Sequence, residues 1–156
     1  MTWRSAHENQ GGTMQESKLS REELTRLLNA EFPEAFNDAS GLVIETVHFG
    51  GCRIRQRFQK ELLRPGGTIS GPTMMRLADV SVYVALLGAI GWTPLAVTTQ
   101  LSIHFLRKPE QADLIAEGKL LKLGKRLVVG EVLIYTDGQG EPVAQAVSTY
   151  AMPSPR

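Results

Sequence analysis

The stretch of residues 73–90 constrains the fold of this chain more than any other part of its sequence. It is apolar on nearly every face of a helix, and a helix that is hydrophobic all round is buried. Turn residues at positions 65–72 precede it, and Pro72 suits the first position of a helix, where its missing N–H costs nothing. The sequence therefore predicts one long helix enclosed by the rest of the chain.

One acid, Asp79, lies inside this apolar helix. Burial of a carboxylate is costly unless the group is paired or takes part in chemistry, which leaves two interpretations open. Arg76 lies three residues earlier and can neutralise the acid in an i,i+3 ion pair, or else Asp79 is a functional group. The apolar run after Asp79 is shorter than the about 20 residues of a membrane span, so we expect no membrane protein.

Composition narrows the class of protein. The chain has 156 residues, enough for one domain with its own core, and its polar start predicts a flexible leader over residues 1–17 before a domain at 18–156. The net charge of +1 gives no basic field for nucleic acid. A single cysteine and the lack of an apolar secretory segment in the first 25 residues predict a reducing, cytoplasmic location.

The remaining elements follow from caps and from alternation. Ser20 and Glu23 form a capping-box pattern that predicts a helix at residues 21–32. Alternating polar and apolar residues predict six strands, at residues 41–50, 52–63, 93–106, 112–123, 126–135 and 143–152. In the second strand Arg53, Arg55 and Arg57 fall on the solvent face, and the alternation slips near Arg57, which predicts a bulge there.

This order of elements fits the α+β class, with a curved antiparallel sheet wrapped around the long buried helix. Such a sheet leaves a free edge and an apolar surface that a second copy of the chain can cover. Three segments, GGTISGPTMMRLAD, AVTTQLSIHFLRKP and KLGKRLVVGEVLIYTDGQGEPVAQAVSTYAM, resemble the hotdog-fold acyl-CoA thioesterases of the PaaI-like group over residues 41–152. The resemblance implies a hotdog fold, a homodimer or tetramer, and hydrolysis of an acyl-CoA thioester. Coenzyme A is then part of the substrate, and neither a separate cofactor nor a metal is expected.

The resemblance also implies roles for particular residues. The backbone N–H of Gly71 would polarise the thioester carbonyl, and Asp79 would act as nucleophile or as general base on water. Thr98 would supply a hydroxyl that helps to hold the water. Ser70 and Arg64 are expected to bind substrate; they stand where family members usually have a His and, in some, a water-holding Asn. The free N–H groups and positive dipole end at the start of a helix suit a developing oxyanion.

Three cations lie beside a predicted turn: Lys122, Lys125 and Arg126. They are candidates for binding the phosphates of coenzyme A, and the alternative is that they are solvated surface charges. Only its residue type supports Cys52 as a nucleophile, and His104 in a strand is more often a packed or rim residue than a catalytic one. A non-hydrolytic acyl-CoA-binding protein and a hotdog dehydratase also stay open, because the usual His and Asn are absent.

The positions of Gly71 and Asp79 predict how a site is assembled. They are eight residues apart on one helix, which separates them by about 12 Å along its axis. An attacking group must come within about 3–3.5 Å of the carbonyl carbon, and an Asp side chain is too short to cover the difference. We therefore expect each site to combine Gly71 of one chain with Asp79 of a second copy.

Overall fold

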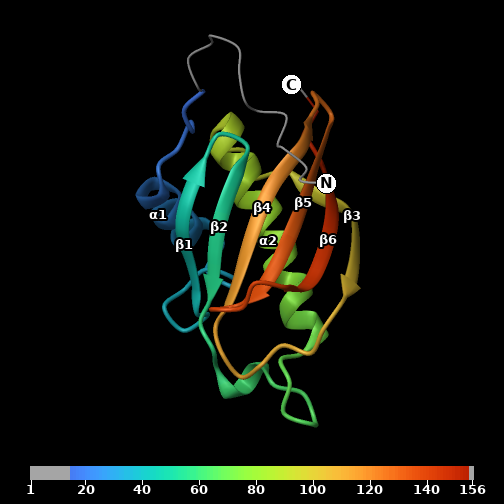
Figure 1. Ribbon diagram of the computed structural model, residues 1–156. Helices are drawn as coiled ribbons and strands as arrows, with labels where there is room; N and C mark the ends of the chain where they lie inside the picture. Colours follow the sequence, from blue (N-terminus) through green and yellow to red (C-terminus); the bar gives the residue numbers. More distant parts are fainter. Residues whose placement is uncertain (1–14, 155–156) are drawn as a thin grey trace.

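The computed structural model describes residues 15–154, in which a six-stranded antiparallel sheet curves around one long helix (Figure 1). The elements are α1 (Arg21–Glu31), β1 (Leu42–His48), β2 (Gly51–Gln56), the short 3-10 helix η1 (Lys60–Leu62), α2 (Gly71–Ile90), β3 (Val97–Phe105), β4 (Leu114–Leu123), β5 (Leu127–Thr136) and β6 (Pro142–Ala151). The strands lie in the order β1-β2-β4-β5-β6-β3. The predicted α+β hotdog fold is confirmed. Most of the predicted leader, residues 1–17, lies outside the described residues.

The long helix α2 is confirmed, and it begins at Gly71 rather than at residue 73. Ser70 caps it, because its side chain accepts a hydrogen bond from the Thr73 N–H, and Pro72 occupies the second helical position. By length and composition α2 could cross a membrane, yet 78% of its most apolar window is buried inside the fold. It is the core helix of the sheet that surrounds it.

Glycines in the sheet let α2 approach closely. A Cβ atom on Gly130 would lie 2.9 Å from the methyl carbons of Val82, and one on Gly118 would lie 3.3 Å from the carbonyl oxygen of Ser81. The Cys52 thiol donates to the carbonyl of Ser81 at 3.1 Å, and burial raises its pKa to about 12. A thiol that is buried and protonated at neutral pH is no nucleophile, so that alternative is wrong.

Two details of the first hairpin differ from the prediction. β2 ends at Gln56, and the chain then leaves the sheet, passing through η1. The bulge lies in β1 at Glu45, not near Arg57. The extra residue places the Glu45 carboxylate 3.1 Å from Arg55 and 3.6 Å from Arg53, which line the outer face of β2 as predicted. An ion-pair group on the outer face accounts for the position of this bulge.

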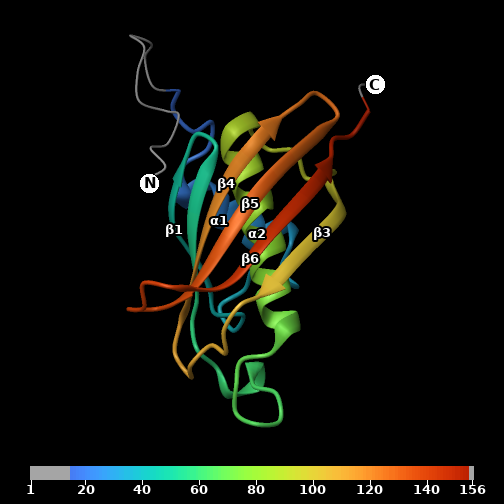
Figure 2. The ribbon, with the colours of Figure 1, turned by 45° about the vertical axis from the view of Figure 1, so that its right-hand side comes forward.

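Among residues 15–154, β3 pairs only with β6, so its other edge has no partner strand in this part of the chain. Figure 2 shows β3 at one margin of the sheet and β1 at the other. Four large apolar side chains in and beside this strand are exposed: Leu95, Val97, Phe105 and Leu106. The edge of β3 therefore combines free backbone groups with apolar surface.

Candidate active site

Asp79 lies on the side of α2 that faces β3 and β6, where two hydroxyl groups hold its carboxylate. Thr98 on β3 donates to Oδ1 at 2.6 Å. Tyr150 on β6 donates to the same oxygen at 2.9 Å and also lies 3.1 Å from the Asp79 carbonyl. Among residues 15–154, none donates a hydrogen bond to Oδ2. One carboxylate oxygen is thus fixed by the protein and the other is available to water or substrate.

Tyr150 is a site residue that the sequence did not indicate. Its ring is buried and stacks on Tyr83, with centroids 5.6 Å apart and planes inclined by 7°. Burial, together with the neighbouring Asp79 charge, raises the pKa of Tyr150, so its hydroxyl keeps its proton and remains a donor. Tyr150 and Asp79 are separated by 71 residues, and the β6 segment contains no local signal of this contact.

The predicted ion pair between Arg76 and Asp79 is wrong. Arg76 instead donates to the side-chain oxygen of Gln56 at 2.8 Å, because it lies on the side of α2 that faces β2. Within the described part of the chain, no cation comes within ion-pairing distance of Asp79. The ion-pair interpretation of this acid is therefore excluded, and its functional role stays a prediction.

A hollow of about 310 Å³, here called the Asp79 hollow, opens beside this carboxylate. Its wall combines the end of α1, the middle of α2 and the start of β3, and it is lined by Glu31, Phe32, Asp79, Tyr83, Trp92, Pro94, Ala96, Val97, Thr98 and Tyr150. Most of these side chains are aromatic or aliphatic. The acid is therefore at the wall of a largely apolar recess that can hold an organic group.

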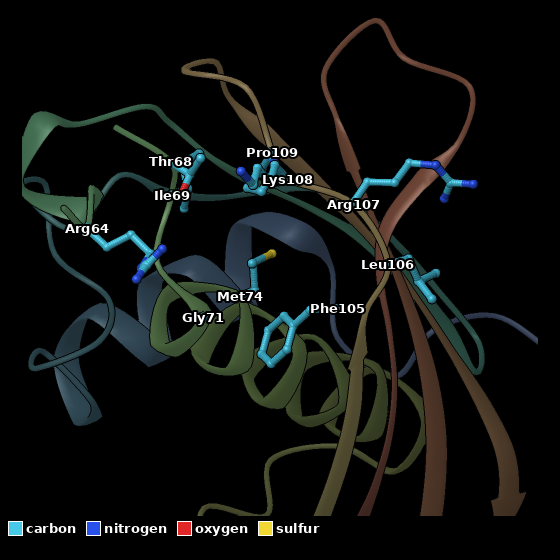
Figure 3. A pocket seen from close by; sticks show the side chains of 10 residues that line it. All are labelled: Arg64, Thr68, Ile69, Gly71, Met74, Phe105, Leu106, Arg107, Lys108 and Pro109. Atoms are coloured by element: carbon cyan, nitrogen blue, oxygen red, sulfur yellow. The ribbon is translucent and has the colours of Figure 1, made fainter. Parts of the chain in front are cut away.

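A second hollow of about 400 Å³, the Gly71 hollow, lies at the start of α2 (Figure 3). It is lined by Arg64, Thr68, Ile69, Gly71, Met74, Phe105, Leu106, Arg107, Lys108 and Pro109. The Phe105 ring covers Gly71 so closely that a Cβ atom there would lie 3.3 Å from the ring. Figure 3 shows Arg64 reaching toward the segment that leads into α2, whereas Arg107 points away.

The structure thus places the predicted site residues in three groups. Arg64, Ser70 and Gly71 meet at the start of α2, and Thr98 joins Asp79 about two helical turns further along. The cations Lys122, Lys125 and Arg126 lie on the β4–β5 hairpin, at the end of the fold opposite to the start of α2 (Figure 1). They line neither hollow of their own chain, and their role stays a prediction. Among residues 15–154, no group of three or more His, Cys, Asp or Glu is placed to hold a metal ion.

Comparison with known proteins supports the fold and identifies the family. Residues 66–143, half of the chain, match the thioesterase superfamily. The chain belongs to this superfamily. A Saccharolobus solfataricus protein named "Putative esterase SSO1253" is 30% identical over 134 residues, which are 86% of each chain.

Solved structures have the same fold. A crystal structure from Silicibacter sp. TM1040, described as a "putative thioesterase", has a TM-score of 0.81 and 41% identity, and the match covers 89% of this chain and 95% of that one. The E. coli PaaI protein from the phenylacetic acid degradation operon has a TM-score of 0.72 at 20% identity, over 83% and 90% of the two chains. At that identity the likeness to PaaI concerns the fold alone.

Proposed function

We propose that this protein hydrolyses acyl-CoA thioesters to a free acid and coenzyme A, at sites shared between two chains of a homodimer. The observation that carries the proposal is the state of Asp79: Thr98 and Tyr150 hold one carboxylate oxygen, and the other is free. Membership of the thioesterase superfamily supports hydrolysis as the reaction. The acyl-CoA substrate and the shared site are our inference.

The chemistry needs a base or nucleophile on one side of the thioester and a donor to its oxygen on the other. As general base, Asp79 Oδ2 takes a proton from water while the water oxygen attacks the carbonyl carbon. Collapse of the tetrahedral intermediate breaks the C–S bond, and the thiolate of coenzyme A leaves and takes up a proton. Direct attack by Oδ2 would give an anhydride that water then hydrolyses; the fixed carboxylate suits either route.

The carbonyl oxygen becomes negative in the transition state, and the start of α2 is suited to that charge. Among the hydrogen bonds of residues 15–154, none uses the Gly71 N–H, which lies at the positive end of the helix dipole. A preorganised donor of this kind raises kcat by a factor of about 10²–10³. Gly71 therefore supplies the electrophilic half of the site.

The two halves belong to separate hollows, which favours a site made from two chains. Gly71 and Asp79 are about 12 Å apart along α2, too far for one thioester to meet both within a chain. A second copy related by two-fold symmetry, with its α2 antiparallel to the first, would bring Asp79 of one chain to Gly71 of the other. The unpaired edge of β3 and its exposed Val97 and Phe105 are the surface that such a pairing would cover.

The same symmetry gives the basic hairpin a place in the site. In a dimer with antiparallel α2 helices, the β4–β5 hairpin of one chain comes to the Gly71 end of its partner. Lys122, Lys125 and Arg126 make no ion pair within the described part of the chain, so they are available for the phosphates of coenzyme A. The single, buried Cys52 fits a cytoplasmic protein that works on this thioester pool.

The proposal is tested by incubating the purified protein with short, long and aromatic acyl-CoAs and measuring the free thiol released. Turnover of at least one acyl-CoA, with a matching amount of free acid, is the expected result. Binding of acyl-CoA in calorimetry without thiol release from any of them would instead identify a non-hydrolytic binding protein. That alternative has a basis in the sequence, since Ser70 and Arg64 replace the family's His and Asn.

A further inference from the structure

We propose that Arg64 donates to the thioester carbonyl oxygen beside the Gly71 N–H, as the second donor of the oxyanion site. The inference rests on the proposed hydrolysis and goes beyond it, because it assigns a catalytic role to a residue that differs from the family pattern. Its basis is the set of donors at the start of α2 and the contacts that Arg64 lacks.

The start of α2 offers one free backbone donor. Pro72 has no N–H. The Thr73 N–H donates to the Ser70 hydroxyl at 3.3 Å, and the Met74 N–H donates to the Ser70 carbonyl at 3.4 Å. Only the N–H of Gly71 is left among the first four residues. An oxyanion gains most when several preorganised donors converge on it, so this helix start needs a further donor from elsewhere.

Arg64 is a cation of this hollow that can be that donor. It lines the Gly71 hollow, and its guanidinium makes no hydrogen bond or ion pair with any of residues 15–154. Figure 3 shows the guanidinium directed toward the segment that enters α2. Arg107, on the other side of the hollow, is already engaged by Glu141 at 3.1 Å and by the Pro142 carbonyl at 2.7 Å.

The backbone around Arg64 holds it in a fixed relation to the helix start. The Arg64 N–H donates to the Thr68 carbonyl at 2.9 Å, and the Gly67 N–H donates back to the Arg64 carbonyl at 3.0 Å. Just beyond, the Ser70 N–H donates to the Leu62 carbonyl at 2.9 Å. This closed turn joins the base of the Arg64 side chain to the N-cap residue of α2, so little ordering of the backbone is required when substrate binds.

The chemistry of the side chain decides between two roles at this position. An Asn can orient a water molecule because its amide both donates and accepts. A guanidinium has five N–H donors and no acceptor, so Arg64 cannot take over that role unchanged. It is suited to an oxygen that becomes negative, and its charge makes each such hydrogen bond stronger than one from a neutral donor. Arg64 thus compensates for the donors that Pro72 and the missing His do not provide.

The first test separates transition-state stabilisation from binding. Arg64→Gln is expected to lower kcat about 10²–10³-fold with little change in KM, as for loss of one oxyanion donor. Lys60→Gln is the matched control, because it removes the same charge from the same segment at a residue that lines neither hollow, and it should leave both constants unchanged. Equal melting temperatures confirm that the variants are folded. A raised KM with unchanged kcat would overturn the proposal and assign Arg64 to a remote part of the substrate.

The second test asks on which chain Arg64 acts. It should belong with Gly71, so a mixture of Arg64→Gln and Asp79→Asn proteins is expected to regain about a quarter of wild-type activity after subunit exchange. A mixture of Arg64→Gln and Gly71→Pro should regain none. Recovery in the second mixture and none in the first would contradict the role of Arg64 beside Gly71, but it would not contradict the proposed hydrolysis. Absence of thiol release from the wild-type protein would contradict the proposed function itself.

Discussion

The two hollows along α2 carry opposite chemistry. The Gly71 hollow offers donors and positive charge, in a backbone N–H, a helix start and the free guanidinium of Arg64. The Asp79 hollow offers a carboxylate among aromatic side chains, held by the hydroxyls of Thr98 and Tyr150. The first presents a backbone N–H and a side-chain cation, and the second presents a carboxylate held by partly exposed hydrogen bonds.

Under the proposed function, neither hollow suffices by itself for thioester hydrolysis. Attack on a carbonyl needs a base and a donor to the oxygen within a few ångströms of one carbon atom. A single helix displays both groups, but about two turns apart, so under this proposal each chain supplies two unlike half-sites. A dimer with two-fold symmetry and antiparallel α2 helices would pair the Gly71 hollow of one chain with the Asp79 hollow of the other. A substitution in the first would then remove a donor to the carbonyl oxygen, and one in the second would remove the base.

The largest effect is expected for Asp79→Asn. The amide keeps the size and shape of the side chain but can neither accept a proton nor attack as a nucleophile, so kcat should fall by a factor of at least about 10³. The far-ultraviolet circular dichroism spectrum should be unchanged. The measurement is thiol release at saturating acyl-CoA. Wild-type turnover in this variant would show that Asp79 is structural.

The next largest loss of kcat is expected when the N–H of Gly71 is removed, and Gly71→Pro and Gly71→Ala form a matched pair for this test. Proline removes the free N–H, and it suits this first helical position because the preceding Ser70 already has an extended conformation, with φ −70° and ψ 152°. Alanine keeps the N–H and adds the same Cβ against Phe105. We expect about 10²–10³ lower kcat for proline than for alanine. Equal rates in the two variants would remove the Gly71 N–H from the mechanism.

A smaller effect is expected at Tyr150, which positions Asp79 and does not itself react. Tyr150→Phe keeps the ring stacked on Tyr83 but loses the hydrogen bond to Oδ1, leaving Thr98 as the remaining donor. A loss of about tenfold in kcat corresponds to one such bond. Tyr83→Phe loses only a bond to the Pro94 carbonyl and should cost less. The comparison is made from kcat at saturating substrate, and equal losses would argue against a positioning role.

The smallest effect lies outside both hollows, on the outer face of the sheet. Arg55 donates to Asp137 at 2.7 Å and to Asp113 at 3.0 Å, and the bond from Arg55 holds the pKa of Asp137 below its usual range. Because the pKa of Asp137 is lower in the folded than in the unfolded protein, its charge stabilises the fold at pH values above the unfolded pKa. This stabilisation is lost as the pH falls below about 4. Asp137→Asn should lower the Tm at pH 7 by less than about 4 °C without changing kcat.

The pH dependence of that difference is its check. The Tm gap between wild type and Asp137→Asn should close as the pH is lowered through the range in which carboxylates are protonated. Asp38→Asn serves as control, because Asp38 is exposed and makes no ion pair among the described residues. Calorimetric scans at several pH values measure the gap. A gap that stays constant down to about pH 3 would show that the substitution acts through packing and not through the charge of Asp137.

The sequence predicted the parts of the fold that local patterns determine. Residues 73–90 could be recognised as a buried helix because every face is apolar, and Ser20 with Glu23 carried the full capping box that the structure confirms. The end of β2 could not be found in this way. Gln56 is buried although polar, because its amide donates to the backbone of Ser40 and Arg57, and the alternation gives no sign of that arrangement.

The site shows the same limit more clearly. Asp79 stood out because a lone acid in an apolar helix requires an explanation, and Thr98 followed from the family resemblance. The ion pair with Arg76, one of two interpretations of Asp79, was wrong, since sequence spacing does not show that Arg76 faces β2 while Asp79 faces β6. Tyr150 is brought to Asp79 only by the pairing of β6 with β3 and β5, which depends on the whole sheet.

The most direct test of the central claim mixes two inactive proteins, Asp79→Asn and Gly71→Pro, under conditions in which subunits exchange. A mixed dimer would contain one site with both groups intact and one site that lacks both. Random exchange makes half of the dimers mixed, so thiol release should recover to about a quarter of the wild-type rate. Failure to recover, with mixed dimers demonstrated by mass spectrometry, would contradict a site built from Gly71 of one chain and Asp79 of another.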